Sequence, residues 1–431
     1  MKTALENLIG HLHKTQWWPL NKLESSQEKE LVNVIKHHAT YTPHFKQRLT
    51  AQGLTPADVS TLAGLTKLTP FTKRDIQLAG DTFDSSVIPP THLPVSIAQS
   101  SGSTGQPVSI KKTKLNELFW GGMAIRDHQW YNRDYKSKLT AIRVISEYSE
   151  IEQWGGPVSL LYGSGPAQGI PVSTDIKEQV KLLNKFQPNI IIIHAGALAA
   201  IVEEWARDGY SLTELKHIKN VGDTVRQPLR DRVREITGLE IEDNYSSSEV
   251  GCMAIQCPTS GLYHIMSESL IVEILDETGK ACKEGEVGRV VVTDLYNAAS
   301  PIIRYDLGDH AEVGGQCSCG RHLPTIKRVM GRDRNLLIRP DGTRFWPPGG
   351  RKTLEKYNVI QWQIVQHAID DIEYRIVRDT PLTEDQHKDM TIAVNDMLKF
   401  PGTIRLVEMS SIPLGKSGKY EESICLIKEP Q

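Results

Sequence analysis

Residues 175–246 constrain the fold most, because segments typical of helices and of buried strands alternate there. TDIKEQVKLLNKF spaces its apolar residues with the period of an amphipathic helix, and the apolar run NIIIIH follows it. A helix at about 197–207, then LKHIKNVGD, another helix and LEIEDNYSSSE continue the alternation. This order predicts a doubly wound α/β sheet, in which ligands bind at the carboxyl ends of the strands. Those ends are the segments 222–224 and 244–246.

The regions before and after this sheet have different patterns. The amino-terminal third is predicted to be helices and loops, with a serine pair capping the helix in SSQEKELVNVIKHHATYTPHFKQRL and Pro43 stopping it. SLIVEILDE and GEVGRVVVTDL, within about 268–306, are typical of strands separated by turns. From about Gly331, two strands, a helix at about 384–399 and the strand TIRLVEM predict a small α+β domain. We therefore predict a large α/β domain with a β-rich subdomain (1–330) and a small C-terminal domain (331–431).

Composition excludes several classes of function. With 431 residues, 39% hydrophobic and 24% charged, the chain is too long for a single core. No apolar run approaches the roughly 20 residues that span a bilayer, and residues 1–20 are too polar for a signal peptide. We expect a cytoplasmic protein without a membrane partner. The net charge of −2 and the lack of a long basic run also argue against nucleic acid as a partner.

The segment SSGSTGQPVSIKK, residues 100–112, combines small and hydroxyl-bearing residues with two lysines. Such residues let backbone N–H groups and hydroxyls surround a phosphate, and Lys111 or Lys112 would add positive charge. Gly105 is followed by Gln106 and Pro107, so this is not the common nucleotide-binding P-loop. By composition alone a solvated Ser/Gly loop is the commoner explanation.

Five segments in order resemble motifs of the acyl-adenylate-forming superfamily, specifically its phenylacetate-CoA ligase-like branch. SSGSTGQP resembles the ATP-phosphate loop, and NYSSSEVG and SPIIRYDLGD resemble two motifs that bind the nucleotide. GRDRNLLIRPDGTRFWP resembles the hinge motif and IPLGKSGKYEES the terminal lysine loop. The resemblance covers about residues 30–425 and implies the large-domain, mobile-small-domain fold of these enzymes.

The resemblance also implies a role for each matching residue. Ser101, Gly102, Ser103, Thr104 and Gly105 would hold the ATP phosphates, Glu249 would hold Mg²⁺, and Lys419 would bridge the acid and the α-phosphate. Gly222, Asp223, Asn244, Tyr245, Ser246 and Ser248 would surround adenine, Asp309 would accept hydrogen bonds from the ribose, and Arg332 would lie near the ribose at the domain boundary.

The motifs depart from the family pattern at a few positions. Ser246 replaces a glycine beside the purine, and the pair Asp306 and Leu307 replaces an Arg-Thr pair, which predicts a negative charge near the purine. In the hinge motif, Arg334 stands at the usual acidic position. We expect the altered hinge to affect thioester formation more than adenylation.

The cysteines indicate a metal site. Cys257, His264, Cys317 and Cys319 form a ligand set suited to tetrahedral Zn²⁺, and the Cys-x-Cys-Gly-Arg segment also occurs in this family branch. Four protein ligands leave no open position, so the zinc would be structural. Free buried cysteines beside a surface histidine are the alternative.

The predicted function is an ATP-dependent carboxylic acid ligase that forms an acyl-AMP and passes the acyl group to CoA. The resemblance favours an aryl acid, with Tyr148, Trp154, Tyr162, His194 and Gly196 as candidate pocket residues. A carrier-protein phosphopantetheine or an amine is an alternative acceptor, and a non-catalytic protein that binds a nucleotide or an acid is an alternative of another class. The resemblance also implies a homodimer.

Overall fold

The first part of the chain is helical, as predicted. A computed structural model describes residues 2–99, 108–332, 335–345, 347, 354, 356–378, 380–412 and 422–427. The amino-terminal helices are α1 (Lys2–Thr15), α2 (Leu20–Tyr41), α3 (Pro43–Ala51), α4 (Leu62–Leu65) and α5 (Lys73–Ala79).

The prediction that the serine pair caps the second helix is wrong. α2 begins directly after Pro19, so Ser25 and Ser26 lie within it. Leu23 and Leu31 are buried on one side of α2, and this apolar face already begins upstream of the serines. Pro43 ends α2 and also begins α3, because a proline at the first helical position removes an N–H that would have had no intrahelical partner.

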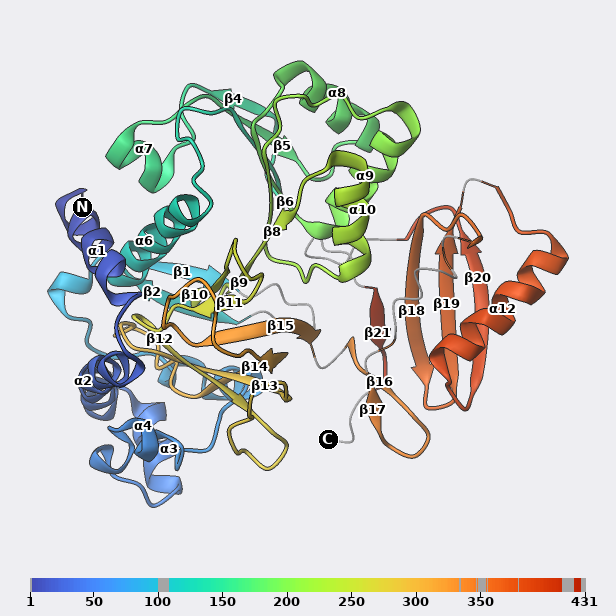
Figure 1. Cartoon of the computed structure of the whole chain (residues 1–431). Coiled ribbons are helices and arrows are strands. Elements are labelled where there is room, and N and C mark those ends of the chain that lie inside the picture. The colour runs from blue at the N-terminus through green and yellow to red at the C-terminus, as the bar shows by residue number, and fades with distance from the viewer. Residues whose placement is uncertain are drawn as a thin grey trace.

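A mostly parallel sheet forms the next layer (Figure 1). Its strand order is β4-β5-β3-β6-β7-β8, with only the β4–β5 pair antiparallel among the strand pairs of this sheet in the described residues. The strands are β3 (Leu139–Arg143), β4 (Ser149–Ile151), β5 (Ala167–Pro171), β6 (Ile190–Ile193), β7 (His217–Asn220) and β8 (Ile241–Glu242). The helices are α6 (Lys114–Trp130), α7 (Gly156–Tyr162), α8 (Ile176–Phe186), α9 (Ala195–Asp208) and α10 (Gln227–Thr237). The doubly wound arrangement predicted for 175–246 is therefore present.

The two faces of this sheet differ in what covers them. Helices α8, α9 and α10 lie on one face and α6 on the other (Figure 1). Ile191 and Ile193 of β6 pack toward the first set of helices, in a core that includes Leu183 and Trp205. Ile190 and Ile192 alternate to the opposite face, as neighbouring strand residues must. That opposite face contributes to the site described below.

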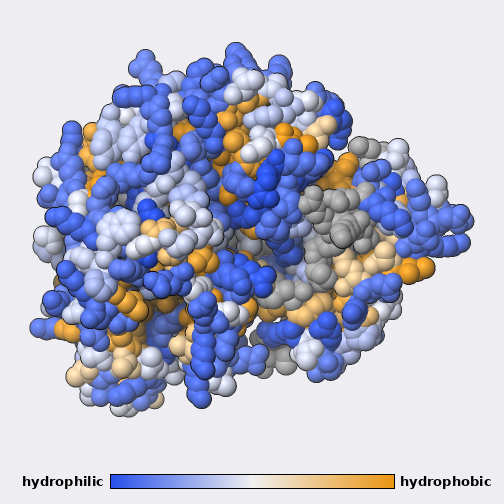
Figure 2. All heavy atoms as spheres, in the orientation of Figure 1, coloured by the Kyte–Doolittle hydropathy of each residue, from blue (hydrophilic) through white to orange (hydrophobic). Residues whose placement is uncertain are grey.

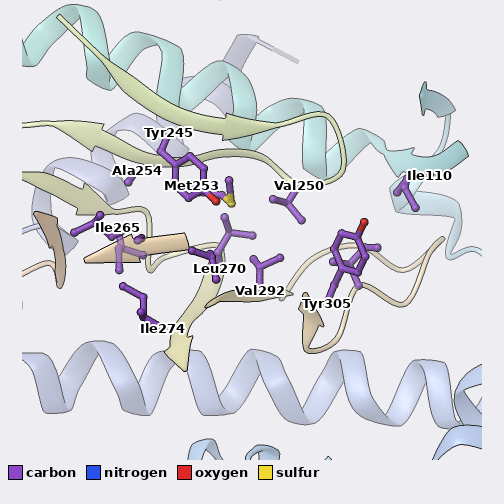
Figure 3. Close-up of a cluster of buried hydrophobic side chains, with 14 of the residues drawn as sticks. Ile110, Tyr245, Val250, Met253, Ala254, Ile265, Leu270, Ile274, Val292 and Tyr305 are labelled. Carbon is purple, nitrogen blue, oxygen red and sulfur yellow. The ribbon is translucent and has the colours of Figure 1, made fainter. Parts of the chain in front are cut away.

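An antiparallel sheet forms the β-rich subdomain, with strand order β12-β13-β14-β15-β11-β10-β9. Its strands are β9 (Asn244–Ser247), β10 (Gly251–Gln256), β11 (Tyr263–Ile265), β12 (Leu270–Leu275), β13 (Val287–Asp294), β14 (Tyr305–Val313) and β15 (Thr325–Arg332). Figure 3 shows its core, where Tyr245, Met253 and Leu270 lie together. A short antiparallel pair, β1 (Val95–Gln99) and β2 (Ser109–Thr113), flanks the glycine- and serine-rich segment.

The C-terminal part forms a separate sheet with a helix against it (Figure 1). The strand order is β20-β19-β18-β21, and β18 and β19 form an antiparallel hairpin. The elements are β16 (Leu337–Ile338), β17 (Arg344–Phe345), β18 (Gln361–Ala368), β19 (Asp371–Val377), α12 (Glu384–Leu398), β20 (Thr403–Met409) and β21 (Ser423–Cys425). Tyr374, Met390 and Leu406 belong to its own hydrophobic core.

The surface is largely polar in the view of Figure 2, where hydrophobic side chains form separate patches among hydrophilic ones. Among the helices that the structure describes, none combines the length and the apolar character needed to cross a lipid bilayer.

Candidate active site

A cavity of about 1570 Å³ lies where the parallel sheet, the antiparallel sheet and α6 meet. Its wall includes residues that follow β6 and β7, all of β9, and the end of β15. The chain passes from one sheet to the other at Asp243, between β8 and β9. This crossing brings the carboxyl ends of the parallel strands next to the antiparallel sheet, at the kind of position where α/β folds bind ligands.

The cavity collects predicted nucleotide-binding residues from three separate motifs. Those that line it are Gly222, Asp223, Asn244, Tyr245, Ser246, Ser248, Glu249, Asp309 and Arg332. Gly222 has a φ of 75°, a conformation that favours glycine, so the turn after β7 exposes its backbone without a side chain in the way.

Tyr245, Asp309 and Arg332 form a connected group at the edge of the antiparallel sheet. The Tyr245 hydroxyl donates a hydrogen bond of 2.7 Å to Oδ2 of Asp309. Arg332 Nε lies 3.4 Å from Oδ1 of the same carboxylate, and Asp309 and Arg332 are opposite each other in the β14–β15 pair. Burial, followed by the charge of Asp309, raises the pKa of Tyr245 well above its usual value, so its hydroxyl stays protonated and can donate. Asp309 is thereby fixed in orientation at the cavity wall.

Glu249 lies two residues before the start of β10 and is 9% exposed. Lys112 Nζ donates to the backbone carbonyl of Glu249, which ties β2 to this part of the wall. Burial lowers the pKa of Lys112, while the nearby carboxylates of Asp294 and Glu249 oppose that shift. Lys111 instead forms an ion pair of 3.1 Å with Asp84. The two lysines that could have served a phosphate loop are therefore both engaged by protein groups.

Asp306, the residue expected to place a negative charge near the purine, is paired with an arginine. Asp306 is not among the lining residues, and its carboxylate accepts a hydrogen bond of 2.6 Å from Arg289. Between Asp306 and His310 the pairing of β14 with β13 shifts register, and Gly308 has a φ of 70°, so regular alternation does not hold in this stretch. The sequence could not indicate this ion pair, because Arg289 lies on the neighbouring strand β13.

Three of the predicted acid-pocket residues line the cavity and two do not. Trp154, His194 and Gly196 belong to its wall, and His194 Nδ1 lies 3.8 Å from Oδ2 of Asp223. Tyr148 and Tyr162 lie outside the set of lining residues; Tyr148 contacts Glu150 and Gln168, and Tyr162 stacks on Tyr135.

A buried group of charged side chains at the cavity wall escaped the sequence analysis. Asp127 of α6 accepts hydrogen bonds from Arg133, at 2.6 Å, and from Lys219 of β7. Arg133 also donates to Glu242 of β8, at 2.9 Å from its Nε. Asp127 and Lys219 line the cavity, and Arg133 and Glu242 do not. Lys219 in the segment HIKN, at the place of a buried strand in the alternating pattern, was the available signal, because lysine is almost never buried without a partner.

The C-terminal part of the chain also reaches the cavity. Glu422, directly before β21, lines the wall and forms an ion pair of 2.6 Å with Arg226, the residue before α10. Burial raises the pKa of Glu422, and the charge of Arg226 opposes this. The predicted residues Ser101, Gly102, Ser103, Thr104, Gly105, Arg334 and Lys419 lie outside the described residues.

Cys257, His264, Cys317 and Cys319 come together as a second cluster, with all their ligand atoms within 4.8 Å of one another. Cys317 Sγ lies 3.2 Å from Cys319 Sγ and 3.7 Å from Cys257 Sγ, and His264 Nε2 lies 3.2 Å from Cys319 Sγ. The sulfur atoms are too far apart for disulfides and near the roughly 3.8 Å spacing of sulfur ligands around tetrahedral zinc.

The histidine of this cluster is oriented for a metal. Its Nδ1 lies 3.2 Å from the Leu323 carbonyl, a contact in which the nitrogen must donate, so Nε2 faces the cysteines with its lone pair. Burial lowers the pKa of His264 to about 4, which keeps the ring neutral. The donor set therefore fits Zn²⁺.

Comparison with known proteins supplies relatives and structural neighbours, although no protein-family model matches the chain. The chain is 26% identical over 331 residues to the phenylacetate-coenzyme A ligase of Thermus thermophilus, covering 74% of this chain and 72% of that protein. It superposes on crystal structures of a 2-hydroxyisobutyryl-CoA ligase at 17% and 16% identity. The TM-score is 0.77 for the postadenylation state with its acyl-AMP, over 96% of this chain and 93% of that one. The TM-score is 0.62 for the thioesterification state with acyl-AMP and CoA, over 95% of this chain and 91% of that one. The fold class predicted from the sequence is confirmed.

Proposed function

We propose that this chain, a homologue of the phenylacetate-CoA ligases with the fold of adenylate-forming enzymes, is an AMP-forming acid-CoA ligase. It would join a carboxylic acid to ATP as an acyl-AMP, release pyrophosphate, and transfer the acyl group to CoA. The observation that carries the proposal is the single cavity that collects Gly222, Tyr245 and Asp309 from three distant motifs.

The connected group at the edge of the antiparallel sheet supports an assignment for the nucleotide. Asp309 would accept hydrogen bonds from the ribose hydroxyls, because the Tyr245 hydroxyl and Arg332 hold its carboxylate in one orientation. Gly222 and Asp223 would lie along the purine, and Ser246 would stand beside it. Asn244 and Ser248 complete this part of the wall.

Glu249 is the carboxylate proposed for Mg²⁺. It lines the cavity, and carboxylate and phosphate oxygens are the ligands that Mg²⁺ prefers. Bound there, Mg²⁺ would offset the negative charge that accumulates when a carboxylate meets the α-phosphate. The loop 101–105 and Lys419 are assigned to the phosphates and to the reacting oxygens by motif resemblance alone.

The Cys257, His264, Cys317 and Cys319 cluster is proposed to hold a structural Zn²⁺. Its four ligands would leave no position for a substrate, so the metal would stabilise the loop before β15 and the β10–β11 turn. The division into a large domain ending at residue 330 and a mobile small domain from 331 is also part of the proposal. It is supported by the separate sheet and hydrophobic core of the C-terminal part, and the antiparallel sheet ends close to this position, since its strand β15 runs to Arg332.

An assay of acid-dependent pyrophosphate release from MgATP, across aryl, fatty and amino acids, tests the proposal. We expect release with one class of acid and a CoA thioester when CoA is added. Release without thioester would redirect the proposal to a carrier protein or an amine as acceptor, and saturable binding without release would support a non-catalytic protein. Size-exclusion chromatography with light scattering tests the expected homodimer.

A further inference from the structure

Strand β3 places a row of three side chains on the sheet face that α6 covers. Leu139, Ala141 and Arg143 alternate along the strand with Thr140 and Ile142, and all three line the cavity. Ile142 packs in the core on the other face of the sheet, with residues of α8 and α9, which fixes the direction of the row. Arg143, the last residue of β3, therefore stands at the carboxyl end of the strand on the cavity side.

The wall beside this row is apolar. Ile192 of β6 lies opposite Ala141, and Trp154 packs in the same cluster as Leu139. Both Ile192 and Trp154 line the cavity. Such a wall suits the hydrocarbon part of a ligand, and it offers no acceptor to a guanidinium. The positive charge of Arg143 therefore needs an explanation of its own.

Arg143 differs from the other cationic residues of the cavity wall. Among the described residues, six further arginines and lysines line the cavity, and each forms an ion pair with a carboxylate of the protein. They are Lys219, Arg226, Arg230, Lys327, Arg328 and Arg332. The Arg143 guanidinium has neither an ion pair nor a hydrogen bond with any residue that the structure describes. Within that part of the chain, the protein supplies a carboxylate for each cation of the wall except this one.

Arg143 can be reached by a ligand and is still crowded by protein atoms. It is an exposed residue of the cavity wall, so a bound molecule can contact it. Burial lowers the pKa of its guanidinium, and no carboxylate of the described residues opposes this shift. The group stays positive at neutral pH, because the pKa of an arginine starts so high. A cation that has lost part of its water without gaining a partner is unfavourable, and a carboxylate that pairs with it through two parallel hydrogen bonds would relieve this cost.

We propose that the substrate is a dicarboxylic acid, and that its second carboxylate, the one that is not adenylated, pairs with Arg143. Strand β6 lies between β3 and β7, so Arg143 is two strand spacings, about 10 Å, from the strand that leads to Gly222. The apolar wall between them would hold the hydrocarbon body of the acid, either an aromatic ring or a short carbon chain. The inference rests on the proposed function, since it names the substrate class for the same cavity.

The test compares matched acids on the unmodified protein. An aromatic series contains phenylacetate, its 3- and 4-carboxy derivatives and the corresponding carboxamides, and a straight-chain series contains hexanoate, adipate and adipic acid monoamide. The amide keeps the shape of the second carboxylate but not its charge. A hydrogen bond between charged groups predicts kcat/KM for pyrophosphate release about 10- to 100-fold higher for one dicarboxylate than for its monoamide and its parent acid. Dicarboxylates no better than their monoamides in both series would overturn the inference.

Three variants locate the effect. Arg143→Gln removes the charge and should lower the dicarboxylate-to-monoamide ratio of kcat/KM by about tenfold or more, and Arg143→Lys, which keeps the charge but not the planar fork, should restore part of it. Arg328→Gln is the matched control, because it makes the same change at an arginine of the cavity wall that is paired with Glu312, and it should leave the ratio unchanged. The ratio compares two acids on one preparation, so a partly unfolded variant does not change it. A ratio that Arg143→Gln leaves intact would contradict the role of this residue.

The phosphates of ATP and CoA are the other anions that the proposed reaction brings into the cavity. If Arg143 served one of them, Arg143→Gln would raise the KM for ATP or for CoA by the same factor with every acid, and the dicarboxylate-to-monoamide ratio would not change. The inference predicts the opposite, a loss that is confined to the dicarboxylate. The KM values for ATP and CoA, measured with the dicarboxylate and with its monoamide, separate the two results.

Failure of the proposed function has a different signature. If no acid releases pyrophosphate, the ligase activity is wrong, and calorimetric titration of the same acids then decides the inference by itself. Tighter binding of a dicarboxylate than of its parent acid and its monoamide, lost in Arg143→Gln, would support it. Equal binding, or no binding of any of them, would reject it.

Discussion

The hydrogen bond between Tyr245 and Asp309 gives the most quantitative prediction. Tyr245→Phe removes the hydroxyl that donates to Asp309 at 2.7 Å and keeps the ring in its place beside Met253 and Ala254. The two residues are 7% and 8% exposed, so water cannot readily replace the lost donor. A hydrogen bond to a charged group is worth about 1.5–3 kcal/mol. If Asp309 holds the ribose, the KM for ATP should rise about 10- to 100-fold.

The assay is acid-dependent pyrophosphate release at varied ATP, with the acid saturating. The KM for the acid should change little, because Asp309 is proposed to bind the nucleotide rather than the acid. Tyr131→Phe is the matched control, since the Tyr131 hydroxyl donates to the Gln256 carbonyl at 3.0 Å and Tyr131 does not line the cavity. An unchanged KM for ATP in Tyr245→Phe would refute the assignment of Asp309 to the ribose.

Three further predictions concern the metal, the terminal lysine and pH. Cys317→Ser should lose the bound zinc and lower the melting temperature, as measured by metal analysis and thermal unfolding. An unchanged zinc content and an unchanged melting temperature would contradict the proposed metal site. Lys419→Ala should abolish adenylation but leave thioester formation from supplied acyl-AMP largely intact, and an unchanged adenylation rate would contradict its role. His38 is buried, which lowers its pKa from 6.5 to about 3. Because the folded protein holds His38 neutral, this residue contributes fully to the free energy of unfolding above pH 6.5. As the pH drops from 6.5 toward 3, the unfolded chain takes up a proton that folded His38 does not, and the free energy of unfolding falls by about 1.4 kcal/mol per pH unit. His38→Gln should flatten this dependence in urea unfolding at several pH values, and identical slopes for both proteins would contradict it.

The apolar patterns within individual sequence segments predicted most helices and strands well. Helices α8 and α9 and strands β6, β7, β12, β13, β18, β19 and β20 lie where the apolar period or alternation indicated. Those patterns report which face of an element is buried, and burial on one face is what stabilises it. Strand β5, with a glycine and a proline in AQGIP, has no such pattern and is held by pairing with β3 and β4.

The site was predictable only in part, because its geometry depends on pairs from distant elements. The residue types in Cys257, His264, Cys317 and Cys319 were enough to suggest one cluster before any fold was known. Asp127 and Lys219 were not, since an aspartate on a helix and a lysine in a strand gain meaning only when the sheet and α6 bring them together. Tyr148 and Tyr162 are the opposite case, because their place in the sequence made them candidates and they do not line the described cavity.

Detection of the acyl-AMP tests the central claim most directly. The protein is incubated with MgATP and an acid that supports pyrophosphate release, first without CoA and then with it, and the products are identified by mass spectrometry. An acyl-AMP that accumulates without CoA and converts to the acyl-CoA after its addition is the predicted result. ATP consumed without an acyl-AMP, or an acyl-AMP that CoA never depletes, would contradict an acid-CoA ligase.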